Sequence, residues 1–595
     1  MMRDISGLFT DNVSRTRLYA FLLCLFSGVV LVLFRAEEMS GMSIGFAAGI
    51  SRGHWYFMSH HLLYQPITKI FADVLGVIGC DTICAGQAHS IAWSLATIVC
   101  VFVIVRRLTG SIVIGLVTAV FFLGTNGFLI YATQLEPYAP LLGANAIIAA
   151  ILLTRIDRPL KTHEITLIIG LYILSLFFHQ ANIFYLVPIT IILKLAYGRD
   201  GLWIAFWIAF VSGIVTASVN GIVFLKLYPD ESFGDFYRWL TYYGVVSNDS
   251  HGSWQQTLSL DPGRLAGAAR QTVIAFIEAP DSGLQKPLRL LFFSGLAMAI
   301  IWNAVGVWKK WSNSRERMFL LAWTLVFALF GYWWLASVYK FYLVLVMPLT
   351  VLCSLMVYDI LKLMRASNSA RVSFLGLVAI VILGTLGLNL SGSAWSLATS
   401  QSPLYSLSKR LSEAAPENCS LYSVRAVAGL VGYYHNRRIR PFNLMFQKYQ
   451  YRSVKPDVAK ALRVSIDLES ESCAVIPLYW LSEEYFYSRP RTSRIVEESD
   501  SPGVESPEWL EFLEWILNTR SEVGRNGISY NPFTVFLYQN EAYIRIDRQQ
   551  RSIASSSEEL SRTINEAVES YPLGGYAGDD FLQSGYYRNR AFGYF

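Results

Sequence analysis

The sequence predicts a polytopic α-helical membrane protein with about eleven spans and a small extracytoplasmic α/β domain at its C-terminal end. Three observations lead to this fold class. Of the 595 residues, 53% are hydrophobic and only 15% are charged, whereas charged residues make up roughly a quarter of a soluble domain. Apolar runs of ~20 residues, the length that crosses ~30 Å of hydrocarbon, recur along the first two thirds of the chain. Basic residues gather at every second boundary between these runs, which is typical of membrane helices with a fixed orientation.

Eleven segments are predicted to span the membrane. The fifth and sixth are divided only by the residues around His179 and Asn182, which predicts a tight helical hairpin there. The predicted spans are 17–35, 87–106, 110–130, 137–154, 164–180, 181–197, 202–226, 288–308, 317–336, 340–362 and 372–392.

The basic boundaries predict the orientation. Their residues are Arg3, Arg15, Arg17, Arg106, Arg107, Arg155, Arg158, Lys161, Lys194, Arg199, Lys309, Lys310, Arg315, Arg317, Lys362, Arg365 and Arg371. The positive-inside rule then places the N-terminus in the cytoplasm and everything after residue 392 outside. The expected location is a bacterial inner membrane, with the endoplasmic reticulum as the alternative. The first apolar run ends in Arg35-Ala36-Glu37-Glu38 without a small-residue cleavage site, so we expect it to be a retained anchor.

The cysteines agree with this orientation. Cys24, Cys100 and Cys353 fall inside predicted spans, whereas the other four fall outside. An oxidising compartment permits disulfides, and the natural pairs are Cys80 with Cys84 and Cys419 with Cys473. Four cysteines allow three connectivities, so the spacing alone does not decide between them.

Residues 1–395 are predicted to form the membrane domain, with two amphipathic outer loops at 36–86 and 227–287. Residues 396–550 are more polar, and alternate strand-like and helix-like segments indicate a small α/β domain. The expected strands are 420–424, 474–478, 494–497, 534–538 and 542–546; the expected helices lie near 404–414, 455–462, 507–519 and 557–570. This region has no glycine-rich phosphate fingerprint after a strand, so no nucleotide site is expected in it. Residues 551–595, rich in Ser, Gly and Tyr, are predicted to be a tail.

Adjacent carboxylates follow the first predicted span. Glu37 and Glu38 lie at the outer membrane surface, and Glu136 lies at the same depth in the next outer loop. A carboxylate in this position can accept a proton from an acceptor hydroxyl, and partial burial raises its pKa toward the working range. The alternative interpretation is that these residues only mark the membrane interface.

Other candidate residues are basic or aromatic. Lys340, at the outer end of the tenth span, could neutralise a lipid-linked phosphate or could snorkel to ordinary headgroups. His60 and His61, followed by Tyr64, could bind phosphate or shape the loop. A divalent metal at the two histidines is a further alternative, and no other cofactor is indicated. The net charge of +6 does not predict a nucleic-acid partner in a membrane protein.

Three stretches resemble the C superfamily of integral-membrane glycosyltransferases. Residues Glu37–Gly41 and Ser59–Pro66 are similar to its acidic residue followed by a His-Pro-x-Leu-Tyr first loop. Tyr131–Ala139 and Tyr339–Leu349 are similar to segments of the protein O-mannosyltransferase-like branch. The sequence departs from that pattern in having Glu-Glu in place of Asp-Glu, and His-His-Leu in place of His-Pro-x. Trp333-Trp334 lies inside a span and lacks the Asp of the oligosaccharyltransferase motif, which disfavours that branch.

The resemblance implies transfer of a sugar from a polyprenyl-phosphate donor to a protein, lipid or glycan acceptor on the outer face, with inversion. It assigns the general base to Glu37 or Glu38, a supporting role to Glu136, and the donor phosphate to Lys340. His60, His61, Tyr64, Tyr138 and Tyr342 fall in the matched motifs and are expected to bind substrate.

Two other functions remain open. A transporter or flippase of a lipid-linked saccharide would carry ionisable residues at mid-span and internal repeats, whereas the polar residues here gather at the outer span ends. A non-catalytic assembly subunit would tolerate replacement of Glu37, Glu38 and Glu136.

Overall fold

A computed structural model describes the chain as two compact units. The first contains most of the helices and comprises residues 1–39, 52–243 and 251–400; the second comprises 40–51, 244–250 and 401–595. The described residues are 13–37, 39–53, 61–227, 229, 236, 240, 261–277, 285–335, 339–364, 368–395, 398, 409, 412–413, 419–423, 439–441, 473–477, 533–538 and 541–547.

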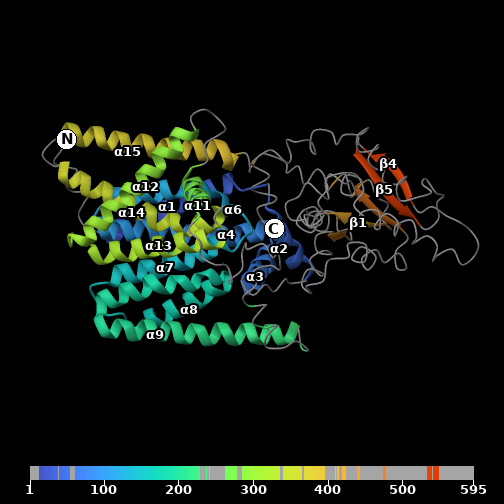
Figure 1. Ribbon diagram of the computed structural model, residues 1–595, viewed down its shortest axis with the longest axis horizontal. Helices are drawn as coiled ribbons and strands as arrows, with labels where there is room; N and C mark the ends of the chain where they lie inside the picture. Colours follow the sequence, from blue (N-terminus) through green and yellow to red (C-terminus); the bar gives the residue numbers. More distant parts are fainter. Residues whose placement is uncertain are drawn as a thin grey trace, which may run out of the picture. The chain divides into compact units, whose positions relative to one another are not determined.

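Long helices lie side by side in the first unit (Figure 1). Within the described residues the helices are α1 (Val13–Leu33), α2 (Gly41–Arg52), α3 (Tyr64–Gly76), α4 (Thr82–Thr109), α5 (Ile112–Leu123), α6 (Asn126–Thr133), α7 (Tyr138–Arg155), α8 (Thr162–Phe178), η3 (Gln180–Tyr185), α9 (Leu186–Leu227), α11 (Pro262–Phe276), α12 (Gln285–Trp308), α13 (Ser314–Leu335), η4 (Tyr339–Tyr342), α14 (Leu343–Leu363), α15 (Asn368–Asn389) and η6 (Leu390–Ala394). Helices α7 and α14 bury most of their apolar side chains, and α4 is about half buried. Helices α1 and α15 expose large hydrophobic residues, as helices facing lipid do.

Among the described residues, seven helices are long and apolar enough to cross a membrane, or eight if the bent pair α5–α6 is one span. This number is lower than the predicted eleven, although each of the eleven predicted segments overlaps a described helix. Helix α8 is too short to qualify, α13 is not among the qualifying helices, and α9 covers two predicted spans. The chain is therefore a multi-pass membrane protein, and the total of eleven spans stays a prediction.

Helix α9 is folded back at Gly198, where φ is 61° and ψ is −125°. A Cβ atom on Gly201 would lie 2.0 Å from the Leu193 carbonyl oxygen, whereas residues eight apart in a straight helix are separated by about 12 Å. Gly198 can adopt the positive φ that the turn requires. The break coincides with the predicted boundary between the sixth and seventh spans.

The predicted span 110–130 is not one straight helix. Helices α5 and α6 are bent by 68° at Gly124 and Thr125. A break inside an apolar bundle frees backbone carbonyls, which need other donors. The Asn389 side-chain amide donates to the carbonyls of Gly124 and Phe276, both at 2.8 Å, and thereby joins the break to the end of α11.

The predicted cytoplasmic boundaries meet at one end of the bundle. Asp157 accepts hydrogen bonds from both Arg107 and Arg315. Arg155 pairs with Glu164 at 2.7 Å. The two Asp157 ion pairs join boundaries that lie far apart in the sequence, so they support the predicted alternation of sides, whereas Arg155 and Glu164 belong to one boundary.

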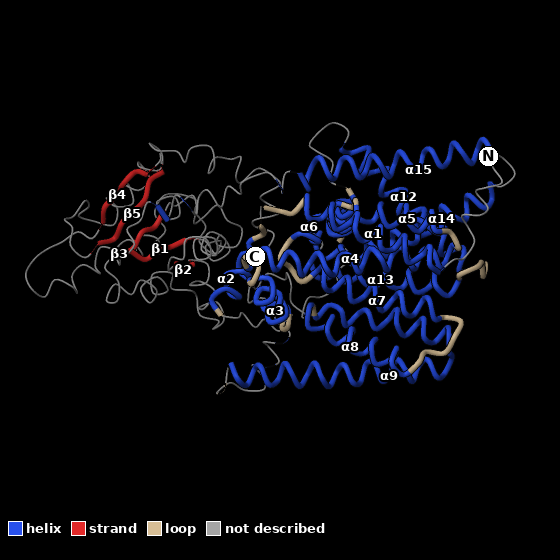
Figure 2. The backbone as a smooth tube through the Cα atoms, turned by 180° about the vertical axis from the view of Figure 1, so that it is seen from behind, coloured by secondary structure: helices blue, strands red, loops and turns tan. Residues whose placement is uncertain are grey.

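Five strands form a sheet in the second unit, with order β2-β1-β3-β5-β4 (Figure 2). They are β1 (Cys419–Ser423), β2 (Ile439–Pro441), β3 (Cys473–Pro477), β4 (Phe533–Tyr538) and β5 (Glu541–Asp547). Strands β2, β1 and β3 are parallel, and β5 is antiparallel to both β3 and β4. Four predicted strands match β1, β3, β4 and β5, whereas β2 was not predicted.

Several predictions for the outer regions lie outside the described residues. They are the strand 494–497, the helices 455–462, 507–519 and 557–570, most of the helix 404–414, the first half of loop 227–287 and the tail 551–595. The amphipathic helix predicted in the second half of that loop is present as α11. The sheet is thus described, and the α/β character of 396–550 stays a prediction.

Candidate functional site

Six buried polar side chains come together from four segments distant in sequence, and we call them the polar cluster. Each has at most 3% of its surface exposed. The cluster comprises Glu136 and Tyr138 from the α6–α7 connection and the start of α7, Lys340 from η4, His179 from the turn between α8 and η3, and His61 and Tyr64 from the start of the α3 region.

Lys340 lies against two aromatic faces within the polar cluster. Its Nζ atom is 5.6 Å from the ring centroid of Tyr138 and 5.7 Å from that of Phe341, distances at which an ammonium is attracted to a ring. Glu136 interacts electrostatically with the ammonium. A buried charge is costly without an opposite charge nearby, so Glu136 and Lys340 form the charged centre of the cluster.

The two histidines pack edge to face beside this centre. Their ring centroids are 5.0 Å apart. His61 Nδ1 is 2.7 Å from the carbonyl oxygen of Phe178, which ties the α3 region to the end of α8. Burial, followed by the influence of His61 and Lys340, holds the pKa of His179 well below its usual range. His179 is therefore neutral at pH 7 and adds no second positive charge beside Lys340.

Tyr64 is held by a short chain of aromatic and hydroxyl contacts. The indole of Trp93 donates to His89 Nε2 at 3.0 Å, so the other ring nitrogen of His89 carries the proton and donates to the Thr68 hydroxyl at 3.1 Å. The rings of Tyr64 and His89 stack with centroids 5.7 Å apart. Burial, with Glu136 nearby, raises the pKa of Tyr64 well above its usual range, so its hydroxyl stays protonated.

Gln87 brings the ends of two predicted outer loops together. Its side-chain amide donates to the carbonyls of Ala36 at 2.7 Å and Thr133 at 2.9 Å. Ala36 directly precedes Glu37, and Thr133 ends the helix before Glu136. One amide nitrogen therefore fixes the chain next to both carboxylates.

Glu37 is exposed, whereas Glu136 is fully buried. Glu38 and His60 lie outside the described residues. The choice between Glu37 and Glu38 as a base stays a prediction. Tyr342 is buried, and its ring packs close to Gly331 rather than in the polar cluster.

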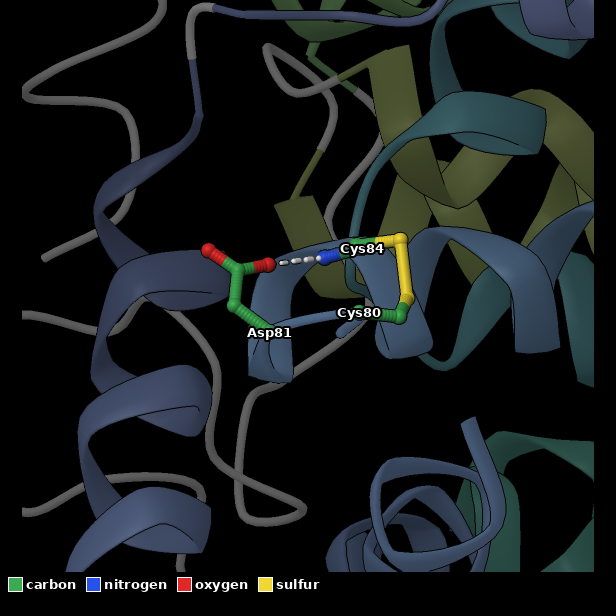
Figure 3. Close-up of a disulfide and its surroundings, with 3 residues drawn as sticks. All are labelled: Cys80, Asp81 and Cys84. Atoms are coloured by element: carbon green, nitrogen blue, oxygen red, sulfur yellow. Dashed lines mark hydrogen bonds between the residues drawn. A yellow bond between two sulfur atoms is a disulfide. The ribbon is translucent and has the colours of Figure 1, made fainter. Parts of the chain in front are cut away.

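The disulfide candidates lie in two places. Cys80 and Cys84 are joined by a disulfide at the start of α4, where the Asp81 carboxylate accepts from the Cys84 N–H at 2.8 Å and caps the helix (Figure 3). Cys419 and Cys473 are paired in register on the neighbouring parallel strands β1 and β3. Their disulfide stays a prediction.

No group of three or more His, Cys, Asp or Glu side chains that could hold a metal occurs within the part of the chain that the structure describes. Because His60 lies outside that part, the alternative of a metal at His60 and His61 stays a hypothesis.

Sequence reasoning missed two residues of this site. It placed His179 at the outer hairpin between the fifth and sixth predicted spans without giving it a role at the site, and it did not single out Gln87. The available signals were a histidine at the outer end of a span and a glutamine in an otherwise apolar run. Neither signal shows which distant segment the side chain meets.

No family model matches the sequence, and no curated protein matches it. Solved structures do resemble the chain. An oligosaccharyltransferase of Archaeoglobus fulgidus in the apo form is 12% identical, with 78% of this chain and 70% of that chain aligned at a TM-score of 0.48. ArnT of Cupriavidus metallidurans in the apo state is also 12% identical, with 78% and 93% aligned at 0.49. The same ArnT bound to undecaprenyl phosphate is 10% identical, with 84% and 97% aligned at 0.46.

Both neighbours belong to the C superfamily of integral-membrane glycosyltransferases, which is the superfamily that the sequence motifs resemble. They do not distinguish the O-mannosyltransferase-like branch. At 10–12% identity and TM-scores below 0.5, the likeness assigns no activity to this chain.

Proposed function

We propose that the chain is a glycosyltransferase that moves a sugar from a polyprenyl-phosphate donor to an acceptor hydroxyl on the extracytoplasmic face. The single observation that carries this proposal is the buried, oppositely charged pair of Glu136 and Lys340, together with the Gln87 amide that holds both the carbonyl preceding the exposed Glu37 and the end of α6. Transfer by displacement requires a cation for the leaving phosphate and a base for the attacking hydroxyl. In this proposal Lys340 supplies the cation, and Glu37 or Glu38 supplies the base.

Lys340 is proposed to hold the donor phosphate. Its ammonium is a compact charge with three donors, and it contacts the rings of both Tyr138 and Phe341. A phosphate that approaches it would be stabilised most as the sugar–phosphate bond breaks, because negative charge then builds on the phosphate oxygens. Glu136, paired with Lys340, is proposed to keep the ammonium charged and in place.

The base is proposed to be Glu37 or Glu38. Its carboxylate takes the proton from the acceptor hydroxyl while the acceptor oxygen bonds to the anomeric carbon. The bond from that carbon to the phosphate oxygen breaks, and the phosphate monoester leaves with the electron pair. Attack from the face opposite the phosphate inverts the anomeric centre. Gln87, which holds the Ala36 carbonyl, is the proposed positioning residue for this carboxylate.

The placement of buried charge disfavours a transporter or flippase. The buried charged side chains of the described residues lie near helix ends, with Glu136 and Lys340 at one end of the bundle. Glu164, Glu316 and Arg317 lie near the starts of α8 and α13. Ion and substrate pathways place such residues within the spans.

We further propose that the polar cluster faces outward, that residues 396–550 form an extracytoplasmic domain, and that the membrane is a bacterial inner membrane. The alternating basic boundaries support this orientation. The acceptor is a protein, a lipid or a glycan, and residues 36–86 and 227–287 are the proposed outer loops around it.

The proposal is tested by measuring the release of polyprenyl phosphate from polyprenyl-phosphate-linked hexoses and pentoses in membranes that contain the full chain. We expect E37Q or E38Q to lower the rate by about 10²–10⁴-fold, as loss of a general base does. K340M is expected to abolish release. The matched control is D73N, which removes another exposed carboxylate of the first outer loop. Full activity in E37Q, E38Q, E136Q and K340M alike would favour an assembly subunit.

A further inference from the structure

The His179 imidazole lies close enough to Lys340 to interact with it electrostatically, and one of its ring nitrogens has no partner within the described part of the chain. The side chain is 3% exposed, and its Nε2 atom has no hydrogen-bond partner among the residues that the structure describes. A buried polar group without a partner costs free energy that is recovered when a ligand supplies the partner. His179 therefore points to a ligand atom that binds here.

The hydrogen bond at Nδ1 shows which ring nitrogen of His179 carries the proton. His179 Nδ1 accepts a hydrogen bond from the Ala181 backbone N–H at 3.1 Å. A neutral imidazole that accepts at one nitrogen carries its proton on the other. The free position is therefore an Nε2–H donor, and its ligand must offer an acceptor.

The surroundings indicate which acceptor fits. The His179 ring centroid is 5.6 Å from that of Tyr138 and 6.1 Å from that of Phe341. The Lys340 Nζ atom lies against the same two rings. A neutral N–H donor and an ammonium that contact the same two aromatic rings are suited to an anion with several acceptor oxygens. A phosphate is such an anion.

We propose that His179 binds the donor phosphate, with its Nε2–H donating to one non-bridging oxygen while Lys340 binds another. This deepens the proposed function and rests on it. Two unlike donors fix the orientation of the phosphate about the sugar bond, which a single ammonium cannot do. His179 also stays neutral beside Lys340, so it adds a hydrogen bond without charge repulsion.

The test measures binding of undecaprenyl phosphate, and of undecaprenol as the phosphate-free probe, to the full chain in detergent. Two variants of similar size are compared: H179Q keeps an N–H donor, whereas H179M has none. We expect H179M to weaken undecaprenyl phosphate binding about tenfold or more, since hydrogen bonds to charged groups are the stronger ones, and to leave undecaprenol binding unchanged. H179Q is expected to retain most of the affinity. The control is H163Q, because His163 is exposed at the start of α8.

The outcomes separate the two proposals. If the unaltered chain binds both lipids equally, the proposed phosphate site is overturned as a whole. If it prefers the phosphate but H179M and H179Q bind alike, only the role of His179 is overturned. Should H179M fail to fold, H179F replaces it as the variant without a donor, and its aromatic ring keeps the packing against Tyr138 and Phe341.

Discussion

The pairing of Glu136 with Lys340 has consequences for stability that differ from its consequences for activity. Both side chains are buried, and their opposite charges interact electrostatically. Removing one partner of a buried pair leaves an uncompensated charge, at a cost of about 3–5 kcal/mol. Replacing both removes that penalty together with the interaction.

We therefore expect E136Q and K340M each to lower the free energy of unfolding by about 3–5 kcal/mol. The double variant E136Q/K340M should be more stable than the sum of the single effects predicts, yet it should bind no donor because the ammonium is gone. Thermal unfolding in detergent and binding of undecaprenyl phosphate measure the two effects separately. Strictly additive destabilisation would show that the two charges are not coupled.

Among elements, the connection between α6 and α7 carries Glu136 and is held closely against α4. A Cβ atom on Gly86 would lie 2.1 Å from Leu135 Cδ1 and 3.2 Å from Leu135 Cβ. Leu135 is fully buried, so it cannot simply turn into solvent. Any side chain at position 86 therefore displaces the residue that precedes Glu136.

For G86A we expect a loss of about 1–3 kcal/mol of stability, typical of an overpacked site, and a clear fall in the rate of polyprenyl phosphate release. The matched control is G170A in α8, where an added Cβ meets nothing within 4 Å. That variant should be neutral or slightly more stable, by about 0.5–1 kcal/mol. Equal effects of G86A and G170A on transfer would contradict the role given to this contact.

The elements also show how far the sequence could predict the molecule. Apolar length and the basic boundaries predicted a helix in every proposed span, because membrane crossing and charge asymmetry leave a local signal. The motifs singled out Glu136 and Lys340, and these two buried side chains interact electrostatically. The break at Gly124 and the place of His179 depend on Asn389 and on the His61 ring, which come from distant segments. No local pattern records such contacts.

At the scale of the whole molecule, the helical bundle has two distinct ends. The ion pairs around Asp157 lie at one end, and the polar cluster lies at the other. On the proposed orientation, the cluster and the Cys80–Cys84 disulfide lie outside, where an oxidising compartment preserves disulfides. Arg158 is exposed at the predicted cytoplasmic end.

This orientation is tested by thiol labelling of intact cells in a C419S/C473S background. A membrane-impermeant maleimide should label Cys80 and Cys84 only after they have been reduced, without any permeabilisation. The cysteine introduced by the control substitution R158C should react with the maleimide only in permeabilised cells. Labelling of R158C in intact cells would reverse the orientation and place the polar cluster in the cytoplasm.

The whole account depends on a lipid phosphate at the polar cluster, and an experimental structure of the full chain with bound undecaprenyl phosphate tests that most directly. We predict phosphate density within hydrogen-bond distance of Lys340 Nζ, on the side of Tyr138 where His179 lies. A well-resolved phosphate held by other basic residues, with the polar cluster unchanged and empty, would contradict it.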